Sequence, residues 1–226
     1  MPLSDAQIER YSRQIVLPQI GGTGQERLLR TSVALAGSGT VAEAAGLYLA
    51  GAGIGSIALH GASNALRDQL VALNPDVIVT LADGRLGNVP ADVLIACDAG
   101  LADIDNAAAS RCPVVAGGVD GDRGWFVVCN GPDTCASCAA RYGVRELAPA
   151  LGWAGSGGRE AAPPPPTPKR QQVAALQIGS LIALAVVKLR LGLGEPAGYW
   201  RFDGHESMLV ERLPERFPGC PVCAAP

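Results

Sequence analysis

The stretch that decides the fold is VALAGSGTVA, residues 33–42. A short apolar run leads into two glycines, and small, helix-compatible residues follow, which predicts a strand, a sharp turn and a helix. Gly37 and Gly39 lack a Cβ, so the backbone there could approach a phosphate. Ala42 would be the third small position, where the helix packs on the strand. A tight turn that binds nothing has the same pattern, so both interpretations stay open.

Around this stretch, apolar segments of strand length alternate with segments of helical length. Parallel strands need a crossover connection, so the alternation predicts an α/β fold with a Rossmann-like, doubly wound, largely parallel sheet. We expect a C-terminal antiparallel hairpin and a single domain over residues 1–226. The expected strands are 56–59, 77–81, 93–96, 113–116, 124–130, 199–203 and 208–213, and the main helices are 44–52, 64–73, 101–110 and 169–191.

Composition restricts the class of protein. The chain has 226 residues, of which 48% are hydrophobic, and a net charge of −3 with its 18 Lys and Arg scattered, so we expect no nucleic-acid partner. The N-terminus carries no basic region followed by an apolar run, which predicts a cytoplasmic protein without a secretory signal. The apolar segment 173–187 is too short for a bilayer of roughly 30 Å, so we expect a buried or subunit-facing helix and no membrane contact.

The composition changes over residues 152–168, which are rich in Gly and Ala and contain four consecutive prolines at 163–166. Such a run cannot be helical and favours an extended chain. We interpret it as a Pro/Gly-rich crossover loop, with an inert linker as the alternative.

Four of the seven cysteines form two C-x-x-C pairs, Cys135 with Cys138 and Cys220 with Cys223. In a reducing compartment this pairing favours a metal over disulfides, and four thiolates suit a structural, tetrahedral zinc site. A redox dithiol and two separate free pairs are the alternatives. The remaining thiols lie in or beside apolar strands and are expected to be packed; they are Cys97, Cys112 and Cys129.

Two polar residues follow expected strands. Asp98 ends the strand 93–96, which places it near the glycine turn, where it could hold Mg²⁺, orient a phosphate or simply cap a helix. His60 follows the second strand, where related folds often carry a carboxylate that binds ribose hydroxyls. That carboxylate is absent from this chain.

Several motifs in order resemble the ThiF/MoeB/HesA family, bacterial relatives of ubiquitin-activating enzymes. They are RYSRQIVLP at 10–18 with the glycines that follow, the glycine turn, LQIGS at 176–180, LGLG at 191–194 and the closing CPVC. The resemblance covers nearly the whole chain. It implies that ATP and Mg²⁺ adenylate the C-terminal glycine carboxylate of a ubiquitin-like or sulfur-carrier protein, with release of pyrophosphate.

The resemblance also assigns roles to residues. It implies that Gly37 and Gly39 lie against the nucleotide, and that Asp98 assists the metal and the phosphates. It further implies that Arg10 or Arg13 reaches across a dimer into the neighbouring site, and that the four cysteines of the C-x-x-C pairs bind zinc. An arginine so placed would stabilise charge that builds on the phosphates.

The sequence departs from the family where the chemistry should lie. LHGA at 59–62 replaces an acidic stretch, and the expected downstream lysine is missing. The segment SNALR at 63–67 resembles the next family segment, which makes Asn64 and Arg67 candidates for nucleotide binding. Loss of several phosphate ligands, at roughly 3 to 4 kcal/mol each, would make adenylation slow. No cysteine lies between Cys138 and Cys220, so a thioester or persulfide nucleophile has no candidate there.

The leading hypothesis is therefore a family member that recognises a carrier tail with impaired ATP use. Such a protein would act as a pseudoenzyme or partner subunit, in a homodimer or in a heterodimer with an active homologue. The alternative is an active adenylyltransferase for a sulfur-carrier or peptide carboxylate. A third reading is a Rossmann-like binder of another nucleotide or metabolite.

Overall fold

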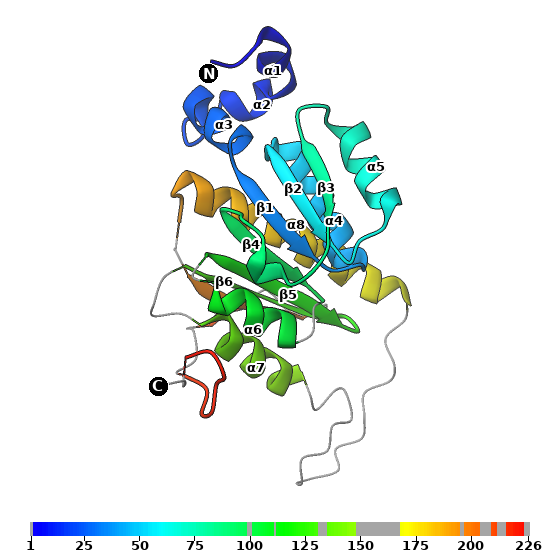
Figure 1. The fold of residues 1–226 in the computed structure, drawn as a ribbon, viewed down its shortest axis with the longest axis vertical. Coiled ribbons are helices and arrows are strands. Elements are labelled where there is room, and N and C mark those ends of the chain that lie inside the picture. Colours follow the sequence, from blue (N-terminus) through cyan, green and yellow to red (C-terminus); the bar gives the residue numbers. More distant parts are fainter. Residues whose placement is uncertain are drawn as a thin grey trace.

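A single mixed sheet organises the computed structural model, which describes residues 2–98, 101–110, 112–130, 135–147, 168–194, 197–203, 209–211 and 216–223. The described strands form one eight-stranded sheet in the order β3-β2-β1-β4-β5-β6-β7-β8 (Figure 1). Their bounds are β1 Ser32–Ala36, β2 Ser56–His60, β3 Ile78–Ala82, β4 Val93–Cys97, β5 Val114–Asp120, β6 Arg123–Cys129, β7 Gly198–Asp203 and β8 Leu209–Glu211.

The sheet changes direction halfway. Strands β1 to β5 pair in parallel, whereas β6, β7 and β8 each pair antiparallel with the strand before them. Helical crossovers join the early strands, but only residues 121–122 separate β5 from β6, with Gly121 at a φ of +63°. So short a turn permits only an antiparallel pair. The predicted fold class and the C-terminal hairpin are confirmed, and the antiparallel part begins two strand pairs before the hairpin of β7 and β8.

Helices cover both faces of the sheet (Figure 1). One face packs against α4 (Thr40–Ala52), α5 (Asn64–Leu73) and α8 (Pro168–Leu191), and the other against η1 (Leu86–Asn88), α6 (Leu101–Ala109) and α7 (Ala136–Leu147). Alternate residues of β1 show why, because Val33 and Leu35 join the first core while Ala34 and Ala36 join the second. The two cores hold the sheet between two helical layers.

The N-terminal segment packs at the end of the sheet where the parallel strands begin. It comprises α1 (Asp5–Arg10), α2 (Ser12–Ile15) and α3 (Gly21–Leu29). Ser4 caps α1 through a capping box. Tyr11 is buried, and its hydroxyl donates to Asp76 at 3.0 Å while accepting from Asn74 at 2.9 Å. These bonds fix the segment to the turn that precedes β3.

Helix α8 is the longest described helix, with 24 residues. Its stretch Gln171–Leu191 has a mean hydropathy of 1.8, which makes it, among the described residues, a helix long and apolar enough to cross a membrane. The helix nevertheless lines the first core through Ile178, Ile182 and Val186. Its outer side exposes Val173, Leu176 and Leu184. Pro168 begins this helix, and the rest of the predicted 152–168 loop lies outside the described residues.

Candidate functional site

The glycine turn lies at the carboxyl end of β1, where the chain enters α4. Gly37 has a φ of +136°, and a Cβ at this position would collide with the carbonyl oxygen of Cys97. Gly39 is the N-cap of α4 and makes no side-chain cap, so the first N–H groups of the helix remain available to an anion. Ala42 is fully buried where α4 packs on the sheet. The turn therefore has the backbone geometry of a phosphate-binding turn.

Asp98 lies directly opposite this turn. It follows β4 with a φ of +48°, a left-handed conformation that is uncommon outside glycine. A Cβ on Gly39 would stand 3.4 Å from its Oδ2, and its Oδ1 accepts a hydrogen bond from the Val119 N–H at 3.0 Å. Although the residue is solvent-exposed, partial desolvation at the sheet edge raises the pKa of its carboxyl, and the bond from Val119 opposes this. The predicted closeness of Asp98 to the turn is confirmed.

The carboxyl end of β2 lies beside the glycine turn and carries no acidic side chain. Gly37 N–H donates to the His60 carbonyl at 3.2 Å, and the His60 side chain is 6% exposed with both ring nitrogens unpartnered among the described residues. Only residues 61–63 join β2 to α5, and Ser63 caps that helix. Asn64 begins the helix, and Arg67 pairs with Asp68 at 2.8 Å. The nucleotide-binding roles of Asn64 and Arg67 stay predictions.

Helices α1 and α2, which carry Arg10 and Arg13, lie beyond the opposite end of the parallel strands from the glycine turn (Figure 1). The Arg10 guanidinium pairs with Asp76, with 3.2 Å between Nε and Oδ2. Arg13 is exposed, and within the described part of the chain it makes no ion pair. Neither arginine reaches the glycine turn of its own chain.

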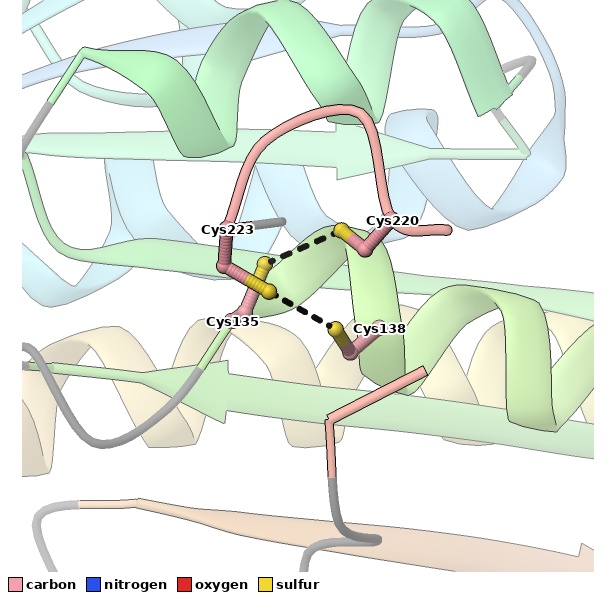
Figure 2. Close-up of side chains that lie close together, drawn as sticks. All are labelled: Cys135, Cys138, Cys220 and Cys223. Carbon is pink, nitrogen blue, oxygen red and sulfur yellow. Dashed lines mark hydrogen bonds between the residues drawn. The ribbon is translucent and has the colours of Figure 1, made fainter. Parts of the chain in front are cut away.

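The four C-x-x-C cysteines come together. The sulfurs of Cys135, Cys138, Cys220 and Cys223 lie within 4.8 Å of one another, the first pair from α7 and its start and the second from the C-terminal turn (Figure 2). The Cys135–Cys220 sulfurs are 3.9 Å apart and the Cys138–Cys223 sulfurs 3.4 Å. A tetrahedral zinc with Zn–S bonds of about 2.3 Å needs sulfurs about 3.8 Å apart. The cluster can therefore hold a metal ion and suits zinc.

Burial and hydrogen bonds shift the pKa values of three of the four thiols in different directions. Burial raises the pKa of the Cys138 and Cys135 thiols. Burial also acts to raise the pKa of Cys220, but bonds from Ser137 and from the backbone of the C-terminal turn outweigh it and lower that pKa to about 6. The Phe217 N–H donates to the Cys138 sulfur at 3.3 Å. The pKa of the Cys220 thiol is thus lowered, whereas burial raises the pKa of its neighbours Cys135 and Cys138.

Sequence reasoning missed the groups beside this cluster. Ser137 lies between the cysteines of the first pair, fully buried and 3.3 Å from the Cys220 sulfur. Arg141 follows one helical turn later and forms a two-pronged ion pair with Asp105 of α6. The spacing of Ser137 and Arg141 on one helix was a readable signal, whereas Asp105 lies 36 residues away in sequence.

Comparisons with known proteins place these features in context. The model of the ThiF family matches residues 11–60, which include the segment from α2 to the end of β2. The sulfur carrier protein ThiS adenylyltransferase of Escherichia coli (strain K12) is 30% identical over 253 residues, covering 98% of this chain and 97% of that protein. The molybdopterin-synthase adenylyltransferase of the same organism is 28% identical over 268 residues and covers 98% of each.

Solved structures share the fold. A crystal structure of E. coli MccB with MccA-N7isoASN superposes with a TM-score of 0.69 at 18% identity, covering 98% of this chain and 76% of that one. A crystal structure of MccB with ATP gives a TM-score of 0.68 at the same identity. At this identity the likeness is one of fold.

Proposed function

Because this chain belongs to the ThiF family, we propose that it is an adenylyltransferase that activates the C-terminal carboxylate of a sulfur-carrier protein or peptide with ATP. The observation that carries the proposal is Asp98, held in a left-handed conformation opposite the uncapped N-terminus of α4. Similarity over 98% of the chain to two adenylyltransferases, one for the sulfur carrier ThiS and one for molybdopterin synthase, supports it further.

The chemistry follows from this geometry. The phosphates would lie on Gly37, Gly39 and the first N–H groups of α4, which supply partial positive charge. The carrier carboxylate attacks the α-phosphorus, an acyl–phosphate bond forms, and the bond to the departing pyrophosphate breaks. Asp98 would hold a Mg²⁺ ion that neutralises the phosphates, a role that requires its ionised carboxylate.

A second copy of the chain would complete the site. Arg13 is the better candidate for a cation supplied in trans, because Arg10 is engaged with Asp76. The exposed apolar residues of α8 offer a surface on which two copies could associate. Mixing an Arg13→Ala chain with an Asp98→Ala chain should then restore one intact site in each mixed dimer, and with it part of the activity that each variant has lost.

A second candidate function is a partner subunit with little ATP chemistry of its own. The three-residue connection from β2 to α5 supports it, because Gly61, Ala62 and Ser63 offer no cation to the phosphates and no carboxylate to the ribose. Such a subunit would keep the carrier-binding shape and pair with an active homologue.

ATP–pyrophosphate exchange separates the two functions. The full chain is incubated with ATP, labelled pyrophosphate, Mg²⁺ and a carrier protein that ends in Gly-Gly. Exchange that falls at least 100-fold in Asp98→Ala, and is unchanged in Asp103→Ala on the neighbouring helix, supports the adenylyltransferase.

Absence of exchange in the folded, metal-loaded chain contradicts the adenylyltransferase, and binding of the carrier by that same sample then supports the partner subunit. Calorimetry that finds tight binding of a dinucleotide but no ATP would favour a binder of another nucleotide instead.

A further inference from the structure

A row of hydrogen-bonded polar side chains lies beside the four-cysteine cluster. The four sulfurs could come together without it. It runs from Asp105 on α6 through Arg141 and Ser137 on α7 to the sulfur of Cys220 near the C-terminus. The ion pair at its far end is only partly accessible, with side chains 23% and 18% exposed for Asp105 and Arg141. This row of polar side chains therefore lies at the border of the second core.

The hydrogen-bonding capacity of each group limits which side chain in this row can donate and which can accept. A guanidinium only donates, so the contact of 2.5 Å between Arg141 Nη1 and Ser137 Oγ makes that oxygen an acceptor. The hydroxyl hydrogen of Ser137 is then free to be donated. Among the described neighbours, the Cys220 sulfur at 3.3 Å lies in hydrogen-bond geometry with this hydroxyl. A thiolate carries no hydrogen, so a metal-bound Cys220 sulfur would accept from this hydroxyl.

Asp105 orients the guanidinium. Its two carboxylate oxygens accept from Nη1 and Nη2 of Arg141 at 2.6 and 2.9 Å, which is the paired geometry typical of a strong arginine–carboxylate bond. Arg141 Nη1 also donates to the Ser137 carbonyl at 3.3 Å. These bonds hold the guanidinium in place. Only the side chain of Ser137 separates its positive charge from the Cys220 sulfur.

We propose that Asp105, Arg141 and Ser137 form an outer shell that holds the Cys220 thiolate on the metal. Four thiolates with one divalent cation carry an excess of two negative charges, which a nearby guanidinium offsets. The shell also links the metal centre to α6, the helix that follows Asp98 in the chain. Its residues position a ligand and do not bind the metal themselves.

The test measures how firmly the full chain holds its metal. Zinc-loaded wild type and variants are mixed with a chromogenic chelator, and the rate of zinc transfer is followed by absorbance. Ser137→Ala and Arg141→Ala should release zinc at least tenfold faster, because outer-shell bonds to metal ligands are worth 10- to 100-fold in affinity. Arg141→Lys keeps the charge but not the paired bond to Asp105, so its rate should fall between those of wild type and Arg141→Ala.

Matched controls remove similar groups elsewhere. Ser180→Ala deletes a hydroxyl that bonds the Gln177 carbonyl on α8, and Arg30→Ala deletes an exposed ion pair with Glu26 on α3. Both should release zinc at the wild-type rate. Wild-type release rates in a Ser137→Ala protein with native circular dichroism would overturn the proposal.

Cobalt gives a readout that does not depend on stability. Loading the chain with Co²⁺ should produce thiolate-to-cobalt charge-transfer bands, and Ser137→Ala should shift them because one sulfur loses its hydrogen bond. A spectrum identical to the wild type in that variant, or wild-type protein without thiolate bands, would also overturn the outer shell.

Discussion

The glycine turn and the cysteine cluster lie at different places on the same sheet and are built in opposite ways. At the cysteine cluster, the Phe217 N–H donates to the Cys138 sulfur, the Ser137 hydroxyl lies within hydrogen-bond distance of the Cys220 sulfur, and an arginine–carboxylate pair lies beside them. The edge around the glycine turn offers one strained carboxylate, Asp98, with a single described hydrogen bond. Several contacts support the cysteine cluster, whereas Asp98 is the one strained carboxylate described beside the glycine turn.

Because of this difference, we expect substitutions in the two regions to affect the stability of the fold to different degrees. Redundant bonding at the cysteine cluster joins the C-terminal turn to α6 and α7, so damage there should weaken the whole fold. At the carboxyl end of β1 the backbone forms the glycine turn, and the carboxylate of Asp98 beside it makes a single described hydrogen bond, from the Val119 N–H. We therefore expect large stability effects at the first region and, glycine substitutions aside, small ones at the second.

The largest effect should come from removing a cysteine of the cluster. Cys220→Ser should lose zinc and lower Tm by about 10 °C, because metal binding contributes directly to folding free energy. Metal analysis and differential scanning calorimetry measure the two changes. Cys112→Ser, a half-buried thiol outside the cluster, is the control and should keep its metal. An unchanged Tm in metal-free Cys220→Ser would show that the cluster has no structural role.

Within the strand edge, Gly37 is the exception. Gly37→Ala should lower the free energy of unfolding by about 3 kcal/mol, because its φ of +136° is closed to other residues and its Cβ would meet the Cys97 carbonyl. Gly61→Ala is the matched control: its φ is +70° and the space around it is open, so about 1 kcal/mol is expected. Equal losses in urea unfolding would contradict the close approach at Gly37.

The ion pair behind the cluster should have an intermediate effect that depends on pH. Asp105→Asn should cost about 2 kcal/mol at pH 7, since Arg141 would lose its charged partner. The Arg141 guanidinium holds the pKa of Asp105 below its usual range, so the folded state binds this proton more weakly than the unfolded chain. The contribution is complete above about pH 4 and is lost as pH falls through the lower, folded value.

Urea unfolding at several pH values measures this difference. The gap in stability between wild type and Asp105→Asn should close as the pH falls below about 4. Asp103→Asn removes an exposed carboxylate from the same helix and should leave the stability profile of the wild type. A gap that stays constant with pH would exclude the ion pair as its cause.

The smallest stability effect should occur at Asp98. Asp98→Gly relieves the left-handed strain while losing the bond to Val119, so its stability should stay within about 1 kcal/mol of the wild type. Asp98→Ala loses the bond and keeps the strain, and it should be about 1 kcal/mol less stable than Asp98→Gly. Both should lose pyrophosphate exchange. The reverse order of stability would show that Asp98 is not strained.

Local patterns were enough for several features. Apolar segments of strand length that alternate with segments of helical length predicted the parallel strands. Asp98 at a strand end was placed near the glycine turn because parallel strands end at the same edge. The pairing of Arg10 with Asp76 and the bond that Arg141 donates to Asp105 could not be predicted, because each joins residues that no local period relates.

By itself, the sequence determined the alternating strands and helices, the backbone freedom at Gly37 and the supply of four thiols, since each depends on residue type and near neighbours. Tertiary structure alone decided that the four sulfurs meet, that Ser137 lies within hydrogen-bond distance of one of them, and that Arg10 is engaged far from the glycine turn. The physical reason is that hydrogen bonds and metal sites need atoms within about 4 Å, and only the packed chain brings distant residues that close.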